Sequence, residues 1–463
     1  MRKLLGTIRG HGSSVLVAAV SSAFGVGLTS ATGVLAQVIG QAGVQSETLS
    51  LILSFIGFIF VALALYIGAV VTSNSFSTIV AGRTRTIALL RLIGSSSRTQ
   101  RRAIAAEGLR VGVIGTLIGS GIALAVTVAG VQGAIYFGVI ADESYGYVTV
   151  LTFLPALAVV ITTTAASWVG SRQVLRVTPI EATGAAAEQP LADPSRRHFW
   201  SLVDFLVGNV ILVVGIVLGL TSPLGIFVAL IGGLLSFTGV VMGAEAIVPR
   251  TLRLAGRLFG SSAPAQLAQQ NAVRYPERST RTTISLVIGV TLVMTFAVAQ
   301  ASFQGIIETA QQAQPGVYEG TGPVLRLAVV VFSVLIGFSA IIAAIGMADN
   351  LALNVSQRRR ELGLLRALGF SAGQVKRMIL IESAQLTTAA VLLGVVLGTF
   401  YGWAGAQSLI GGILGSPGIV VPVVPLVLLA VVIVAAILLA VIASIVPARR
   451  ATRVSPIEAL AQR

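Results

Sequence analysis

Two stretches of this chain are copies of one motif, RTRTIALLRLIGSSSRTQRRAIAAEG at Arg83–Gly108 and RRRELGLLRALGFSAGQVKRMILIES at Arg358–Ser383. The arginine, glycine and glutamate at 91, 94 and 107 recur at 366, 369 and 382, an offset of 275. A second motif, RVTPIEA from residue 176, recurs as RVSPIEA from residue 453. A repeat of this period with so little slippage indicates a duplicated module, as in many transporter folds.

The composition is that of a membrane protein. Hydrophobic residues make up 55% of the chain and charged residues 10%, whereas soluble domains are about a quarter charged. The 51 glycines fit this class, because glycine lets membrane helices approach closely. The chain has no cysteine, which excludes disulfides and thiolate metal sites. His11 and His198 are far apart in sequence and do not suggest a metal cluster.

Long apolar stretches predict ten transmembrane helices. We place them near 14–38, 49–80, 106–130, 147–170, 203–220, 224–247, 282–303, 325–350, 379–403 and 423–447. The basic residues cluster in alternate connections, and the other connections (39–48, 131–146, 221–223, 304–324 and 404–422) contain no Lys or Arg.

This alternation follows the positive-inside rule and predicts a multi-pass protein of the cell membrane with both termini cytoplasmic. Basic residues on the cytoplasmic side would contact anionic lipid headgroups, which explains the net charge of +15. Nucleic acid is therefore not an expected partner. The basic, then apolar, start of the chain is also typical of a signal peptide; a retained span is favoured because the duplication needs it. For the hairpin at 203–247 two arrangements stay open, two full spans or one span with a partly re-entrant helix.

The predicted fold is therefore an all-α integral membrane protein with two parallel four-span repeats. Residues 1–182 form the first unit and 282–463 the second, joined by a linker (183–281) that carries the two-span hairpin and a cytoplasmic segment. Both repeats hold an even number of helices and so have the same orientation. Within the linker, Pro264–Ala272 fits an amphipathic interfacial helix.

Each copy of the long motif is expected to form a short amphipathic helix, a turn and the start of the next span. Gly94 and Gly369 would end the short helices. Ser371, and either Ser95 or Ser96, would cap the helices that follow. A helix that only anchors the loop is the alternative, but duplication favours two matching docking surfaces.

The stretch ELGLLRALG at 361–369, with the basic run VPARRATRVSPIEAL at 446–460, resembles the FtsX-like permease domain of MacB- and LolC-type (type VII) ABC transporters. The resemblance covers roughly 49–182 and 325–460. It implies a permease subunit driven by a separate cytoplasmic ATPase, which binds a coupling helix between the second and third spans of each unit. The first copy departs from the family pattern where Thr86 stands at the position of Glu361 in the second copy.

Carried onto this chain, the resemblance implies coupling helices at about Arg83–Gly94 and Arg358–Gly369. The residues implied for contact with the ATPase are Arg83, Arg85, Leu90, Arg91, Gly94, Arg359, Arg360, Glu361, Leu365, Arg366 and Gly369.

No Walker A loop occurs, because the only lysines are Lys3 and Lys376 and neither lies in such a motif. We therefore expect that the chain is not an enzyme and binds no cofactor. ATP and Mg²⁺ would bind to the partner ATPase. Two permease units in one chain imply two ATPase copies per chain.

Glycines four residues apart, Gly115 and Gly119 in the third span and Gly394 and Gly398 in the ninth, predict close helix packing between the two halves. Ordinary lipid-facing glycine is the alternative reading. No carboxylate lies in the middle of a predicted span, which disfavours an ion-coupled secondary transporter.

The outer connections at 39–48 and 304–324 are too short to fold independently, so no large extracytoplasmic domain is expected. A substrate would be met within the bilayer: a lipid, an amphipathic peptide or a hydrophobic drug. A non-transporting signalling scaffold, like the cell-division member of the family, stays open as an alternative. Membrane lipids are expected partners in either case.

Overall fold

The structure is a computed structural model. It describes residues 12–41, 47–138, 141–175, 194–260, 262–274, 276–314, 364–365, 368–412 and 418–453, with short pieces at 329, 332–333, 336–341 and 344–345. The regular elements of this described part are all helical, and seven of its helices are long and apolar enough to cross a membrane. The chain divides into two compact units, Met1–Gln189 and Pro190–Arg463.

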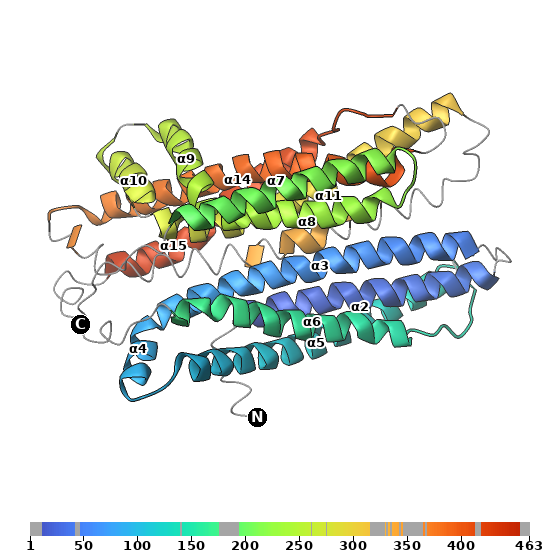
Figure 1. The fold of residues 1–463 in the computed structure, drawn as a ribbon, viewed down its shortest axis with the longest axis horizontal. Coiled ribbons are helices and arrows are strands. Elements are labelled where there is room, and N and C mark those ends of the chain that lie inside the picture. The colour runs from blue at the N-terminus through green and yellow to red at the C-terminus, as the bar shows by residue number, and fades with distance from the viewer. Residues whose placement is uncertain are drawn as a thin grey trace. The chain divides into compact units, whose positions relative to one another are not determined.

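The first unit is a bundle of four long helices, α2 (Gly12–Gln41), α3 (Glu47–Gly82), α5 (Ser97–Tyr136) and α6 (Val150–Gly170). Helix α2 packs against the other three, and α5 packs against α6. A short helix, α4 (Thr84–Leu92), lies across one end of the bundle, as Figure 1 shows. The 3-10 helix η1 (Ser171–Leu175) closes the same end of α6.

The second unit contains α11 (Pro276–Ala313), α14 (Ala372–Ile410) and α15 (Leu426–Arg453), with α14 packed on both others. The linker helices also belong to this unit. They are α7 (Pro194–Gly219), α8 (Gly225–Met242), α9 (Ala244–Gly256), the 3-10 turn η3 (Arg257–Phe259) and α10 (Ala263–Arg274). Both α7 and α8 are long and apolar enough to span a membrane.

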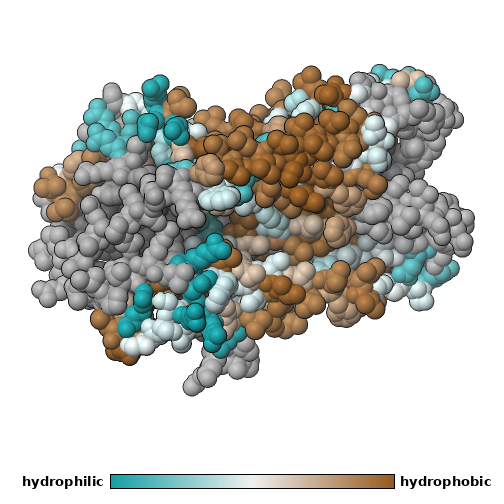
Figure 2. Space-filling model, viewed as in Figure 1, coloured by the Kyte–Doolittle hydropathy of each residue, from teal (hydrophilic) through white to brown (hydrophobic). Residues whose placement is uncertain are grey.

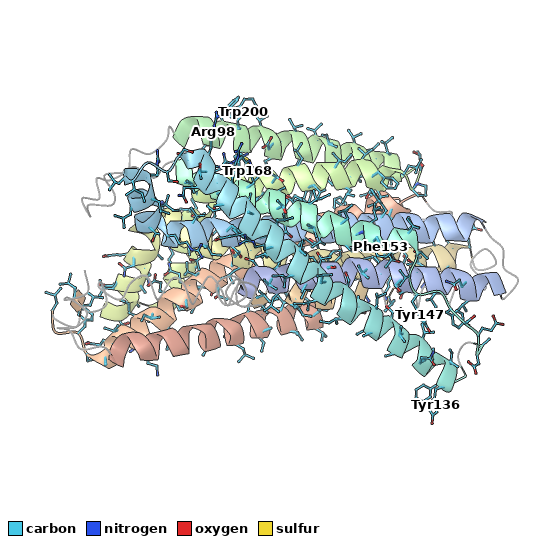
Figure 3. All side chains as sticks on the ribbon, turned by 90° about the horizontal axis from the view of Figure 1, so that it is seen from below. Arg98, Tyr136, Tyr147, Phe153, Trp168 and Trp200 are labelled. Carbon is cyan, nitrogen blue, oxygen red and sulfur yellow. The ribbon has the colours of Figure 1, made fainter. Side chains whose placement is uncertain are left out.

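Nine of the ten predicted spans coincide with helices of the structure; the eighth, at 325–350, lies mostly outside the described residues. Figure 2 shows hydrophobic residues gathered around the middle of the helices and hydrophilic residues toward their ends. In Figure 3 Tyr136 and Tyr147 lie at the end of the first unit opposite Arg98 and Trp168. This distribution is typical of a bilayer-spanning bundle.

Backbone contact through glycine holds α5 on α2 in the first unit and α14 on α11 in the second. A Cβ atom at Gly115 would lie 2.9 Å from the carbonyl oxygen of Val15 and 3.0 Å from the amide nitrogen of Ala19. A Cβ at Gly119 would overlap the carbonyl of Ala19, one turn further along α2. In a membrane, such small residues allow the close packing that substitutes for the hydrophobic effect.

The second unit repeats this arrangement with α14 on α11. A Cβ at Gly398 would lie 2.7 Å from the carbonyl oxygen of Thr291, and one at Gly394 would lie 2.6 Å from the side chain of Val290. These glycines pack closely on a neighbouring helix, whereas the sequence predicts that the contact lies between the two halves. Each pair of glycines contacts a helix of its own unit, because α2 and α5 are neighbours in the first unit and α11 and α14 are neighbours in the second.

Helix α10 corrects a second detail. The predicted helix exists, but its apolar face is covered by protein. Ala265, Ala268 and Ala272 are fully buried, and Ala268 packs against the residues Val375 and Met378 of α14. The small size of these alanines allows helix-on-helix packing, which covers the apolar face with protein.

The glycine contacts predict opposite effects for two neighbouring substitutions in α5. We expect Gly119→Ala to destabilise the protein by about 1–3 kcal/mol, because the added methyl overlaps the α2 backbone. Gly121→Ala should be neutral or stabilising by up to about 1 kcal/mol, because a Cβ there meets no atom within 4 Å. Thermal unfolding in detergent checks both. Equal destabilisation by the two variants would contradict the packing.

Candidate functional site

The buried side of α4 fixes it to the end of the first bundle. Ile87 and Ala88 pack in a cluster with Val80 of α3 and Val174 of η1, against Ile104 of α5. The helix follows α3 directly, with the Arg83 N–H donating to the Val80 carbonyl at 3.0 Å. Helix α4 is therefore packed against three elements of its own unit.

A glycine turn ends α4 and starts α5. Gly94 has a φ of 99°, a conformation that glycine adopts without strain. The Ser95 N–H donates to the Leu90 carbonyl at 2.9 Å, which is the hydrogen bond of a Schellman motif. Ser96 then caps α5, its Oγ accepting from the Thr99 N–H at 3.1 Å. The predicted ends at Gly94 and the cap at Ser96 are confirmed.

The second copy forms the same turn, 275 residues later. Gly369 has a φ of 98°, and the Phe370 N–H donates to the Leu365 carbonyl at 3.1 Å. Ser371 caps α14 by accepting from the Gln374 N–H at 3.2 Å, while Gln374 Oε1 accepts from the Ser371 N–H at 2.8 Å. The motif therefore specifies one local structure twice. We call residues 84–96 and 364–371 the first and second coupling turns.

Large apolar side chains stand exposed at matching positions of the two turns. Leu89 and Leu364 are 50% and 51% exposed, and Ile93 and Leu368 are 81% and 71% exposed. Helix α5 has 40 residues, so it is about 60 Å long, twice the roughly 30 Å of the hydrocarbon core. Its first turns carry Arg98, Arg101 and Arg102. The coupling turn at this end therefore stands outside the hydrocarbon.

The supports beneath the two turns differ. The first rests on the end of α3 and on η1. In the second, Leu365 and Phe370 pack against a cluster that contains Ala268 of α10 and Val375 of α14. The linker thus supplies part of the seat of the second turn, whereas the first is seated within its own four-span unit.

The structure describes only some of the charged residues that were predicted to contact the ATPase. Arg83 Nη1 lies 3.4 Å from Glu107 Oε2, and both side chains are partly exposed, so the pair contributes at most about 1 kcal/mol. Arg91 is half-buried and Leu90 lies at the exposed surface. The side chain of Arg85 and the residues Arg359, Arg360, Glu361 and Arg366 lie outside the described part, so their contacts stay predictions.

Sequence reasoning missed one contact beside the first turn. The Arg101 guanidinium lies 4.0 Å from the ring centroid of Trp168. Its Nη2 donates to the Trp168 carbonyl and its Nε to Ser171 Oγ, both at 3.1 Å. These bonds tie the start of α5 to the end of α6. The second copy has no tryptophan at the corresponding position. An aromatic residue that is not repeated and that lies near basic residues could have indicated this contact from the sequence.

The family follows from comparison with known proteins. The model described as FtsX-like permease C-terminal matches residues 58–179 and 333–456, together more than half of the chain. This chain belongs to the FtsX-like permease family. The two matched segments each include one coupling turn and the long helix after it, so the resemblance drawn from the repeated motif is confirmed.

Individual relatives of this FtsX-like permease match over shorter segments. An uncharacterised ABC transporter permease, YknZ of Bacillus subtilis, is 31% identical over 30% of this chain and 33% of its own length. The ABC transporter permease YtrF of the same organism is 33% identical over 26% of this chain and 30% of its own. A macrolide export ATP-binding/permease protein, MacB of Rhodopirellula baltica, is 30% identical over 27% of this chain and 17% of its own length. The chain thus spans a third or less of these relatives.

The missed arginine contact generates a prediction. Arg101→Ala should destabilise the permease by about 2 kcal/mol, because it removes two charge-assisted hydrogen bonds and the contact with the Trp168 ring. Arg102→Ala, one residue along and exposed, is the matched control and should change stability by less than about 0.5 kcal/mol. Thermal unfolding followed by tryptophan fluorescence measures both. An Arg101→Ala variant as stable as the control would show that the contact does not stabilise the bundle.

Proposed function

We propose that this chain is the permease subunit of an ABC transporter and couples ATP hydrolysis by a separate ATPase to export or extraction of a membrane-embedded substrate. The observation that carries the proposal is the pair of matching coupling turns. Four large apolar side chains in water would cost free energy unless a protein covers them, since exposed apolar groups flanked by charge mark protein interaction sites. Family membership and the names of the relatives support an ATPase as that protein.

The two turns would bind two ATPase subunits. Leu89 and Ile93 would enter an apolar recess of one subunit, and Leu364 and Leu368 the same recess of the other. The residues Arg83, Arg85, Leu90, Arg91, Gly94, Arg359, Arg360, Glu361, Leu365, Arg366 and Gly369 would form these two surfaces. Since the supports differ, and Thr86 stands where the other copy has Glu361, the two surfaces would bind with different affinity.

Motion would reach the membrane through α5 and α14. Each is a continuous helix that begins at a coupling turn and is long enough to cross the bilayer, and glycine contacts fix α5 to α2 and α14 to α11. Drawing two ATPase subunits together would therefore move both four-helix units without a flexible joint. We place the protein in the cell membrane with the coupling turns and both termini in the cytoplasm, because the arginines concentrate on that side.

The substrate would be a lipid, an amphipathic peptide or a hydrophobic drug. The connection between α2 and α3, Gln41 to Glu47, is too short for a substrate-binding domain. Recognition would then occur among the apolar helices.

The coupling proposal predicts that one charge on each apolar tip prevents ATPase binding. Ile93→Asp and Leu368→Asp should each weaken binding at their own turn at least about tenfold, because a buried unpaired carboxylate is costly. The double variant should lose the ATPase altogether. Co-purification of the co-expressed ATPase and its hydrolysis rate measure both effects. Ile93→Leu and Leu368→Ile, which keep an apolar tip, are the controls. Normal association of the double variant, with unchanged thermal stability, would refute the coupling turns as docking surfaces.

ATP hydrolysis by the reconstituted complex distinguishes transport from signalling. A transporter of embedded substrates should hydrolyse ATP faster by at least about twofold when its lipid, peptide or drug is added, because substrate binding favours the conformation that the ATPase closes. A panel of lipids, cationic peptides and macrolides in nanodiscs provides the measurement. No stimulation by any of them, with retained binding of a cell-wall enzyme, would favour a signalling scaffold.

A further inference from the structure

One face of α9 and η3 is both basic and apolar, and it is exposed. Arg250, Arg253 and Arg257 lie three and four residues apart, with Leu254 and Leu258 beside them. The three arginines are exposed, and the two leucines are 58% and 72% exposed. We call these five residues the α9 face.

The opposite side of α9 is anchored in the second unit. Val248, Leu252 and Ala255 are fully buried. Gln385 Nε2 of α14 donates to the Leu252 carbonyl at 2.8 Å, and Gln269 Nε2 of α10 donates to the Gly256 carbonyl at 2.8 Å. The helix therefore presents its exposed face in one fixed direction.

The position of α9 points to the membrane surface. Helix α8, a candidate span, ends at Met242, and only Gly243 separates it from the start of α9. In Figure 1 α9 runs across the long helices α11 and α14 rather than along them. A helix that leaves the end of a span and turns across it lies at the level of the lipid headgroups.

The chemistry of the α9 face fits anionic phospholipid. Guanidinium groups bind phosphate oxygens through paired N–H donors. Arg250 uses one of its donors on the Ala246 carbonyl at 2.6 Å and keeps others. Leucines between the arginines suit the boundary between headgroups and acyl chains. Glu245, in the first turn of α9, falls on another side of the helix at 3.6 residues per turn, so it does not reverse the charge of this face.

We propose that the α9 face binds the anionic phospholipids of the bilayer surface, with Arg250, Arg253 and Arg257 on headgroup phosphates and Leu254 and Leu258 in the acyl boundary. The proposal depends on bilayer insertion of α8 and not on the ATP-driven function proposed above.

Lipid binding at α9 would act on one coupling turn. The buried side of α9 is bonded to α10 and α14, and α10 packs in the cluster that seats Leu365 and Phe370. The first turn rests on α3 and η1 instead. Anionic lipid would therefore stabilise the position of the residues that pack beneath the second coupling turn, and it would leave the first coupling turn unaffected.

The absence of cysteine from this chain makes a direct test possible, because one introduced thiol is the only thiol. We would label Leu258→Cys with a nitroxide in the full-length chain, in nanodiscs of phosphatidylcholine with or without phosphatidylglycerol. Collision with oxygen, which concentrates in lipid, and with a water-soluble nickel chelate reports the depth of the label. Gln270→Cys, on the exposed side of α10, is the reference position for water.

With phosphatidylglycerol, the label at residue 258 should become more accessible to oxygen than to nickel, and the label at residue 270 should not. Arg250→Gln, Arg253→Gln and Arg257→Gln together should abolish the dependence on phosphatidylglycerol, since each arginine near an anionic surface strengthens binding about fivefold. The matched control removes three exposed arginines of the first unit, Arg98, Arg102 and Arg172, by the same change. It should leave the depth of residue 258 unchanged.

Three results would overturn the proposal. One is a label at residue 258 that is as accessible to nickel as the reference in both lipid mixtures. Another is protection that occurs only when the co-purified ATPase is added, which would assign the α9 face to an acidic surface of that protein. An effect of the control triple equal to that of the α9 triple would also contradict it, because bulk charge would then be sufficient.

Discussion

Direct backbone contact of α5 with α2 in the first unit, and of α14 with α11 in the second, is the constraint on which the rest of the structure depends. A bilayer offers no hydrophobic drive for helix association, so affinity comes from close packing. Gly115 and Gly119 bring α5 onto the backbone of α2, and Gly398 brings α14 onto Thr291 of α11. Since α5 and α14 begin at the coupling turns, the same contacts that assemble each bundle also determine where its coupling turn stands.

The sequence predicts the parts of this fold that depend on local chemistry. Gly94 and Gly369 end helices because the backbone there needs a positive φ, and Ser96 and Ser371 cap helices because their hydroxyls reach the free N–H groups of the next turn. These effects act within a few residues. Span positions followed from hydropathy for the same reason, since a stretch of apolar residues is itself the requirement for crossing a bilayer.

Partners across space could not be predicted in this way. The glycine spacing indicates a close contact but carries no information on which helix makes it, so the contact was assigned between the halves when it lies within each. Likewise, the spacing of apolar residues in α10 predicts an apolar face. Which residues pack against that face depends on where Val375 and Met378 lie after folding. The Arg101–Trp168 contact joins residues 67 apart in sequence and has no repeat to reveal it.

Duplication explains the matching tips of the two coupling turns, and the linker explains their difference. A motif copied with its local bonds reproduces the exposure of Leu89 in Leu364 and of Ile93 in Leu368. The residues that pack beneath a coupling turn come from other elements. Helix α10 of the linker packs beneath the second turn only. Through Gln269 and Gln385, α10 and α14 are bonded to α9, whose outer face is basic. Lipid bound at the α9 face, as proposed, would therefore act on the second coupling turn and leave the first unchanged, whereas two identical subunits would respond alike.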